Sequence, residues 1–165
     1  REPVMSTERL PTEELESELR NAGWVSLNNE RAQADLLGNR IDMRGVNDPH
    51  IRLDRYHEVA GGFDPDASLR LAVTHAPYLR VLDPMADDGA DLIIAGHTHG
   101  GQVCVPGYGA LVTNCDIDGK RAKGLSTHAG AALHVSAGLG TNPYAPVRLA
   151  CPPEATMLHL VPRAE

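Results

Sequence analysis

Histidines and glycines are concentrated in one short segment, residues 91–102, which reads DLIIAGHTHGGQ. His97 and His99 stand two positions apart, directly after an aliphatic run that is typical of a buried strand. In an extended backbone alternate side chains point to the same side roughly 6 to 7 Å apart, which suits two ligands of one ion or of two neighbouring ions. Glycines on both sides let the backbone approach a metal or an anionic substrate closely. The segment therefore predicts metal binding.

A third histidine is expected at the same place. His75 follows an aliphatic run at residues 69–74, and a second run at residues 90–95 leads into His97, with a helical pattern between them. A strand, a helix and a strand in this order form a βαβ unit with parallel strands, whose carboxyl ends lie at one edge of the sheet. Open α/β sheets bind their ligands at that edge. We therefore predict that His75, His97 and His99 converge on a divalent metal ion.

The remaining histidines have no comparable sequence context. A lone histidine in a globular chain is more often structural or solvent-facing than a ligand. We expect this of five residues: His50, His57, His128, His134 and His159.

The other segments predict an α/β chain. Residues 11–22 have apolar side chains at helical spacing, a proline suited to the first turn and a glycine just after the end, so they predict a helix. Further strands are expected at residues 24–27, 41–46, 102–105, 133–137 and 156–161, the first two as an antiparallel pair. Short helices are expected near residues 50–57 and 66–69, and a helix at residues 76–89 is expected to break at Asp83–Pro84.

Composition excludes several functional classes. The chain has 165 residues, enough for one ordinary domain, and 15 Lys and Arg against 22 Asp and Glu, a formal net charge of −7. An acidic chain of this kind lacks the positive charge that grips a nucleic-acid backbone. Its three cysteines have no CxxC spacing, which favours buried thiols over a disulfide framework or a thiolate zinc site. No apolar run reaches the roughly 18 to 20 residues of a membrane span, so the chain as given is expected to be soluble.

Other histidine-rich metal motifs fit this chain poorly. The metallo-β-lactamase pattern requires an aspartate and a histidine where Gly101 and Gln102 stand, and an HxHxH triad requires a histidine at position 101. The sequence contains no HExxH, and an amidohydrolase barrel needs about 250 residues.

Two segments resemble the last two metal-binding motifs of the calcineurin-like metallophosphoesterase superfamily: LAVTHAP at residues 71–77 and GHTHGGQ at residues 96–102. With VSAGLG at 135–140 and CPPE at 151–154, the chain is similar to the bacterial YkuE/YaeI-type branch over about residues 22–161. The resemblance implies a two-sheet β-sandwich with flanking helices and hydrolysis of a phosphomonoester or phosphodiester by a metal-bridged hydroxide. It also implies two divalent ions (Mn, Zn or Fe), with His75 and His97 on one and His99 on the other.

The chain departs from this family in one respect. The family's N-terminal motifs DxH, GDxxD and GNH[D/E] are absent from residues 1–165. We therefore expect a single partial domain, the C-terminal half of a larger phosphoesterase, that holds at most one partially coordinated ion and is inactive alone. Its partners would be the N-terminal half and a phosphate-ester substrate, and an uncovered apolar sheet face would favour self-association. The alternative is a non-catalytic metal-binding or interaction module.

The sequence assigns no cellular location to the chain. Relatives of the YkuE type often carry an N-terminal membrane or export segment, so the resemblance implies a parent protein that is membrane-anchored or exported.

Secondary candidates have weaker signals. Arg148 follows a proline-rich turn and is a candidate to bind a substrate phosphate bidentately, against the alternative of a structural or surface ion pair. Tyr108 and Asn142 are candidates to line the cleft.

Two acidic segments also have a structural and a functional interpretation. Asp48 and His50 belong to a segment similar to the family's GVDDP element and could approach the site, whereas the alternative for Asp48 is to cap a short helix. Asp87 and Asp88 are expected to form a solvated helix end.

Overall fold

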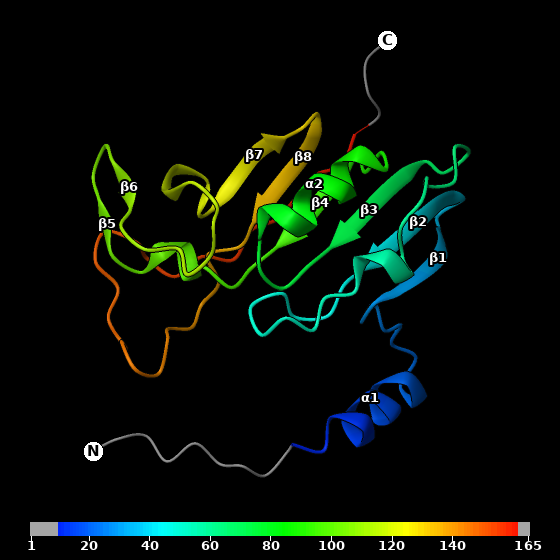
Figure 1. The fold of residues 1–165 in the computed structure, drawn as a ribbon, viewed down its shortest axis with the longest axis horizontal. Coiled ribbons are helices and arrows are strands. Elements are labelled where there is room, and N and C mark those ends of the chain that lie inside the picture. Colours follow the sequence, from blue (N-terminus) through cyan, green and yellow to red (C-terminus); the bar gives the residue numbers. More distant parts are fainter. Residues whose placement is uncertain (1–9, 162–165) are drawn as a thin grey trace.

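The aliphatic runs of the sequence form the centre of a mixed six-stranded sheet in the computed structural model, which describes residues 10–161 (Figure 1). The strands occur in the order β1-β2-β3-β4-β8-β7. Their bounds are β1 (Glu30–Leu36), β2 (Asn39–Gly45), β3 (Leu69–Val73), β4 (Leu92–Ala95), β7 (Gly124–His128) and β8 (Ala131–Val135). The four strands β2, β3, β4 and β8 are parallel, and antiparallel β1 and β7 form the two edges.

The remaining elements are short. A two-stranded antiparallel sheet consists of β5 (Cys104–Val105) and β6 (Gly109–Ala110), and Figure 1 shows it beyond the β7 end of the large sheet. The helices of the described residues are α1 (Thr12–Asn21), α2 (Leu79–Asp87) and the 3₁₀ helices η1 (Tyr56–Glu58), η2 (His99–Gly101) and η3 (Gly119–Arg121). The α/β class expected from the sequence is therefore confirmed.

Within residues 10–161 no helix has the length and apolar character needed to cross a membrane.

The predicted βαβ unit is confirmed. The chain passes from β3 through α2 to β4, and the two strands are parallel neighbours with Val73 beside Ile94. The helix runs through Pro84, so the predicted break at Asp83–Pro84 is wrong. A proline inside a helix costs one backbone hydrogen bond, but the face of α2 that carries Val81, Leu82, Met85 and Ala86 is buried and offsets this loss.

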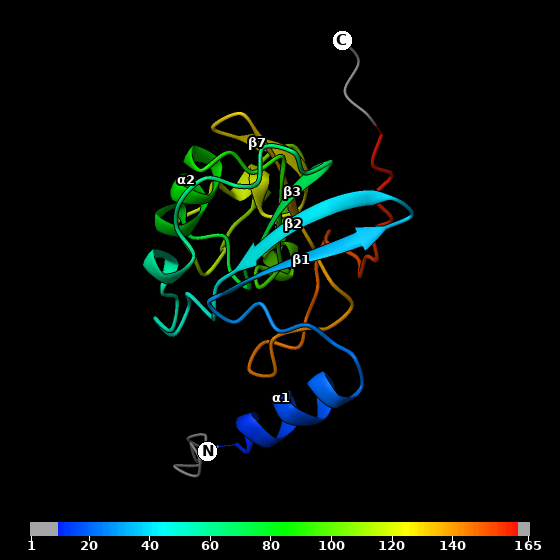
Figure 2. The same ribbon diagram turned by 90° about the vertical axis from the view of Figure 1, so that its right-hand side faces the viewer.

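The core lies on the α2 side of the sheet. The register aligns Arg44, Ala72, Ile93 and Leu133 across four strands, and all four side chains are buried. Residues of α2 pack on this row together with Val59 and Phe63 from the segment around η1. Figure 2 shows α2 on one side of the sheet and the C-terminal segment on the other.

The opposite face is only half-buried. Its row consists of Met43, Leu71, Leu92 and Ala132, of which only Leu92 is buried. The C-terminal segment runs along this side without regular structure, and its Met157 side chain is 82% exposed (Figure 2). No second large sheet packs here within the described residues. The expectation that the chain is the C-terminal half of a two-sheet sandwich with flanking helices therefore stays a prediction.

The N-terminal part differs from its prediction. The helix at residues 11–22 is confirmed as α1, but it buries none of its residues. The strand expected at residues 24–27 is wrong, because β1 at residues 30–36 pairs with β2 instead and Trp24 remains 67% exposed. Leu37 and Gly38 connect β1 and β2 with positive φ at both positions, as a tight hairpin requires.

Several short elements also differ. The strand expected at residues 156–161 is an irregular segment without strand pairing. The short helix expected at residues 66–69 does not form, because a turn at residues 65–66 leads into β3, which begins at Leu69. The helix expected near residues 50–57 is limited to the single 3₁₀ turn η1. The strands β6 and β7 were missed from the sequence.

Candidate functional site

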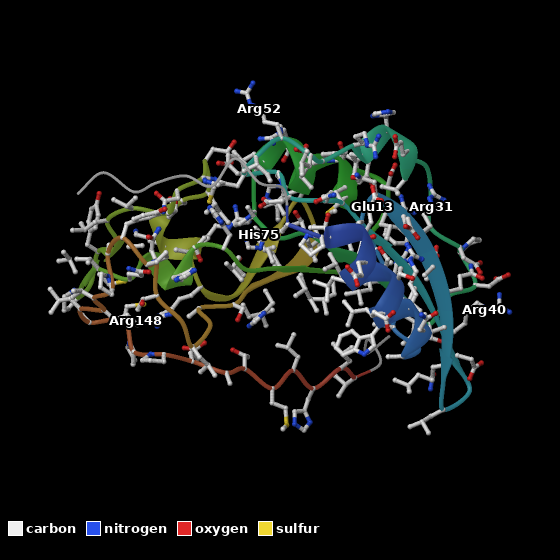
Figure 3. The ribbon with its side chains drawn as sticks, turned by 90° about the horizontal axis from the view of Figure 1, so that it is seen from below. Glu13, Arg31, Arg40, Arg52, His75 and Arg148 are labelled. Atoms are coloured by element: carbon white, nitrogen blue, oxygen red, sulfur yellow. The ribbon has the colours of Figure 1, made fainter. Side chains whose placement is uncertain are left out.

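Two of the predicted histidines meet at the carboxyl ends of β3 and β4. Hydrogen bonds from the Thr74 amide to the Ile94 carbonyl (3.0 Å) and from the Gly96 amide to the His75 carbonyl (2.9 Å) hold the two strand ends together. The side chains then converge, with 3.2 Å between His75 Nε2 and His97 Nδ1 and an edge-to-face ring geometry. The His75 side chain is labelled in Figure 3. His75 is exposed and His97 half-buried, so this pair is open to a ligand from solvent.

The proton positions of His97 follow from its second contact. Its Nε2 atom lies 3.3 Å from the carbonyl oxygen of Asn114, which can only accept, so we place the ring proton on Nε2. Nδ1 then keeps its lone pair and faces His75. A ring nitrogen that donates to a backbone carbonyl while the other nitrogen carries a free lone pair is the usual arrangement of a metal-ligating histidine.

The nitrogen separation also fits a metal ion. Two nitrogens bound to one zinc at ~2.0–2.1 Å with an angle between ~90° and ~110° lie roughly 2.9–3.4 Å apart. The observed 3.2 Å between His75 Nε2 and His97 Nδ1 lies in this range.

The electrostatic surroundings favour the neutral form of His97. Burial lowers the pKa of His97, and the neighbouring rings of His50 and His75 lower it further, while the Asn114 carbonyl acts in the opposite direction. A histidine must be neutral to bind a metal, so a lowered pKa extends the pH range in which His97 can do so.

His50 lies beside this pair. Its ring centroid is 4.4 Å from that of His97, and its Nδ1 atom is 3.1 Å from the hydroxyl of Tyr78. Because the Tyr78 hydroxyl donates its one proton to Asn114, it must accept from His50 Nδ1, which leaves the lone pair on His50 Nε2. His50 is exposed, as expected of a solvent-facing histidine, and it also lies against His97, as expected if it approaches the site. Asp48 accepts a hydrogen bond from the His50 amide and so has the local capping role.

Sequence reasoning missed Tyr78 and Asn114. Tyr78 stands three residues after His75, in the segment HAPY, which is the one signal that could have singled it out. Asn114 contributes only its backbone carbonyl, so its residue type carries no signal.

His99 is not joined to His75 or His97 by any hydrogen bond or ring contact in the described part of the chain. It begins η2, and its Nδ1 atom is buried without a hydrogen-bond partner there. The backbone of this loop has positive φ at His97 (67°), His99 (51°) and Gln102 (51°), a conformation that residues other than glycine rarely adopt. Such strain is concentrated at functional sites.

The structure thus assembles two of the three predicted ligands. Among residues 10–161 no three His, Cys, Asp or Glu side chains are placed to hold one metal ion. The pair His75 and His97 fits part of such a site, and the role of all three histidines as metal ligands stays a prediction.

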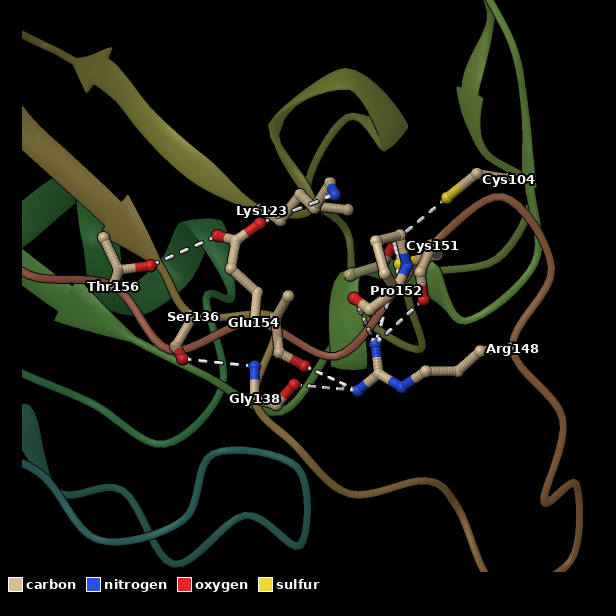
Figure 4. Close-up of polar contacts among 12 residues, drawn as sticks. Cys104, Lys123, Ser136, Gly138, Arg148, Cys151, Pro152, Glu154 and Thr156 are labelled. Carbon is tan, nitrogen blue, oxygen red and sulfur yellow. Dashed lines mark hydrogen bonds and ion pairs between the residues drawn. The ribbon is translucent and has the colours of Figure 1, made fainter.

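Arg148 contacts backbone carbonyls rather than a charged partner (Figure 4). Its Nη1 donates to the carbonyls of His99 (3.0 Å) and Cys151 (3.3 Å), and its Nη2 donates to those of Ala137 (2.8 Å) and Gly138 (3.1 Å). This set ties the η2 loop to the C-terminal segment. The contacts favour the structural alternative, and phosphate binding by Arg148 stays a prediction.

Neither of the two cleft candidates forms a hydrogen bond with His75 or His97 in the described part of the chain. Tyr108 is 65% exposed in the turn between β5 and β6. The Asn142 amide donates to Gln102, and its side chain accepts from the Tyr144 amide.

The expectation of a solvated helix end is wrong for Asp88. One of its carboxylate oxygens accepts from the Arg44 guanidinium (3.0 Å), the Tyr56 hydroxyl (2.5 Å) and the Gly61 amide (2.9 Å). Arg44 is buried and stacks on the Phe63 ring, with its central carbon 3.5 Å from the ring centroid. The acidic residue therefore neutralises a charge inside the core.

Comparisons with known proteins give a partial similarity. No family model and no solved structure matches the chain significantly. The chain is 30% identical over 132 residues to the uncharacterized protein YpbG of Bacillus subtilis (strain 168), covering 80% of this chain and 50% of that protein. It is 36% identical over 92 residues to Phosphodiesterase YaeI of Escherichia coli (strain K12), covering 56% of this chain and 32% of that protein. The chain thus spans half or less of these relatives and is similar, over part of its length, to a phosphodiesterase.

Proposed function

We propose that this chain is the C-terminal part of a metal-dependent phosphoesterase that hydrolyses a phosphomonoester or phosphodiester. The observation that carries the proposal is the 3.2 Å approach of His75 Nε2 and His97 Nδ1 at the carboxyl ends of two parallel strands. The partial similarity to a phosphodiesterase supports the reaction class. We further propose that the missing carboxylate ligands come from the part of the relatives' length that this chain does not span.

The roles of the residues follow from their contacts. His75 and His97 would hold one of two divalent ions (Mn, Zn or Fe), with the Asn114 carbonyl fixing the ring of His97, and His99 would serve the other ion. Divalent ions bound there supply a hydroxide nucleophile and stabilise negative charge on the phosphate oxygens. His50, whose ring lies against His97, would help to shape the entrance for the substrate.

Metal uptake by the chain tests the site. Calorimetric titration with Zn²⁺ should show binding of at most one ion per chain, weakened at least ~10-fold in His97→Asn. Asparagine tolerates the positive φ at position 97, so this variant removes the ligand with little backbone strain. The matched control is His57→Asn, an exposed histidine in η1, which should bind as the wild type does. Equal binding by wild type and His97→Asn contradicts the proposed site.

An assay of phosphodiester hydrolysis distinguishes a phosphoesterase from a non-catalytic module. Hydrolysis of bis-p-nitrophenyl phosphate with Mn²⁺ or Zn²⁺ should be absent for the chain alone and should appear when an N-terminal half is supplied in trans. The alternative, a non-catalytic metal-binding or interaction module, predicts metal uptake without activity even then. Robust turnover by the chain alone, lost in His97→Asn, would refute the half-site interpretation.

A further inference from the structure

We propose that Cys104 and Cys151 form an oxidisable pair that joins the β5 strand to the C-terminal segment as a disulfide. All three cysteines of the chain are free thiols in this structure. The sulfur atoms of Cys104 and Cys151 lie 3.2 Å and 3.3 Å from one and the same oxygen atom, the Gly100 carbonyl. Figure 4 shows the two side chains approaching this point from different segments.

The backbone places the two cysteines on neighbouring extended segments. Val103 and Leu149 form a parallel bridge, and the Cys104 amide donates to the Leu149 carbonyl at 2.9 Å. Cys104 follows Val103 by one residue, and Cys151 follows Leu149 by two. In the register of this bridge Cys104 stands opposite Ala150, so Cys151 is offset from it by one position. Because both sulfur atoms lie within 3.3 Å of the same Gly100 oxygen, the two thiols are neighbours, and rotation of the side chains is expected to bring them to the ~2.05 Å of a disulfide bond.

Specific contacts hold Cys151 in place. A Cβ atom on Gly100 would lie 2.7 Å from the Cys151 sulfur, so only glycine at this position leaves room for it. Arg148 donates to the Cys151 carbonyl at 3.3 Å and lies 3.7 Å from its sulfur. Cys151 is buried, whereas Cys104 is half-exposed, so an oxidant from solvent reaches Cys104 first.

The reaction with a small disulfide such as oxidised glutathione is balanced. The Cys104 sulfur attacks one glutathione sulfur, the glutathione disulfide bond breaks, and one glutathione leaves as a thiol. The Cys151 sulfur then attacks the Cys104 sulfur of the mixed disulfide and releases the second glutathione. Two protein thiols are oxidised, one oxidised glutathione is reduced to two thiols, and the two protons go to the departing glutathiones.

The bond would restrain the loop that carries the predicted ligands. The Gly100 carbonyl, which both thiols contact, belongs to η2 directly after His99. A cross-link that closes the chain between residues 104 and 151 is expected to raise the melting temperature by up to ~10 °C. This inference is independent of the proposed phosphoesterase function.

The test uses the full chain incubated with oxidised or reduced glutathione. Thiol titration should fall from three thiols to one per chain in the oxidised sample, with the chain still monomeric on a non-reducing gel. Mass spectrometry should find the tryptic peptide 149–163 linked to the peptide 81–120. Because the latter contains both Cys104 and Cys115, the Cys115→Ser variant assigns the bond and should still form it.

Two further variants complete the test. Cys104→Ser should abolish the linked peptide, and because Cys104 is half-exposed this variant should fold even where Cys151→Ser does not. A linked peptide and a reversible rise in melting temperature support the proposal. Three thiols that persist in oxidised glutathione, a stable glutathione adduct on Cys104, or a bond that requires Cys115 would overturn it.

Discussion

The buried charge of Arg44 depends on Asp88, so the free energy of unfolding should be sensitive to the loss of this carboxylate. The Arg44 side chain is 1% exposed and that of Asp88 22% exposed, with 3.0 Å between the charged groups. Asp88→Ala removes the one carboxylate within residues 10–161 that pairs with the Arg44 guanidinium and leaves an uncompensated charge in the core. Breaking a buried pair by removing one partner costs about 3–5 kcal/mol, so we expect a loss of this size in the free energy of unfolding.

Replacing Arg44 should lower the free energy of unfolding by less than replacing Asp88 does. In Arg44→Met the carboxylate of Asp88 remains partly exposed and still accepts from the Tyr56 hydroxyl and the Gly61 amide, so its charge is not stranded. We therefore expect Asp88→Ala to be more destabilising than Arg44→Met, and the double variant to be more stable than the two single losses added together.

Urea denaturation followed by circular dichroism measures these differences. The control is Asp87→Ala, a neighbouring exposed acidic residue, which should change the free energy of unfolding by no more than ~0.5 kcal/mol. The reasoning fails if Asp88→Ala is as mild as Asp87→Ala, or if Arg44→Met is the worse of the two.

Three further predictions follow from the fold. Burial, and then the bond to Asp88, raises the pKa of Tyr56 to about 12, so the folded state holds this proton more tightly than the unfolded state; stability should fall from about pH 10 to about pH 12, less steeply in Tyr56→Phe, as alkaline urea titrations would show. Gly101→Ala should cost ~1–3 kcal/mol more than Gly107→Ala in thermal melts, because both glycines have positive φ but only a Cβ at position 101 meets another atom, 2.2 Å from Ala110 Cβ. Self-association through the half-buried sheet face should appear in sedimentation and weaken in Met43→Lys, whereas a strictly monomeric wild type at high concentration argues against it.

The centre of the sheet was predictable and its edges were not. The strands β3 and β4 are short aliphatic runs on either side of a helical pattern, and this order of strand, helix and strand is what located them. The edge strand β1 reads ERAQADL and is largely exposed, so it has no hydrophobic pattern. Its pairing depends on the hairpin at Leu37 and Gly38, whereas the apolar residues Trp24 and Val25 suggested a strand where none forms.

In the candidate site, too, the contacts at strand ends could be predicted and the contacts made by irregular segments could not. His75 and His97 could be placed together because parallel topology fixes where strand ends lie. Tyr78 and the Asn114 carbonyl reach the same point through irregular segments that have no periodic signal. The contacts of Arg148 could not be read from the sequence either, because they are made with backbone carbonyls, which every residue type has.

The backbone of the loop that begins at His97 has a consequence for tracing this fold among distant proteins. Its positive φ values at positions 97 and 99 suit asparagine or glycine better than histidine. A descendant in which both imidazoles were exchanged for such residues would lose two donor atoms while keeping or even improving the loop conformation. Chains that lack both imidazoles are therefore expected to share the loop shape, and only the side chains, not the trace of the main chain, distinguish them from chains that keep the two histidines.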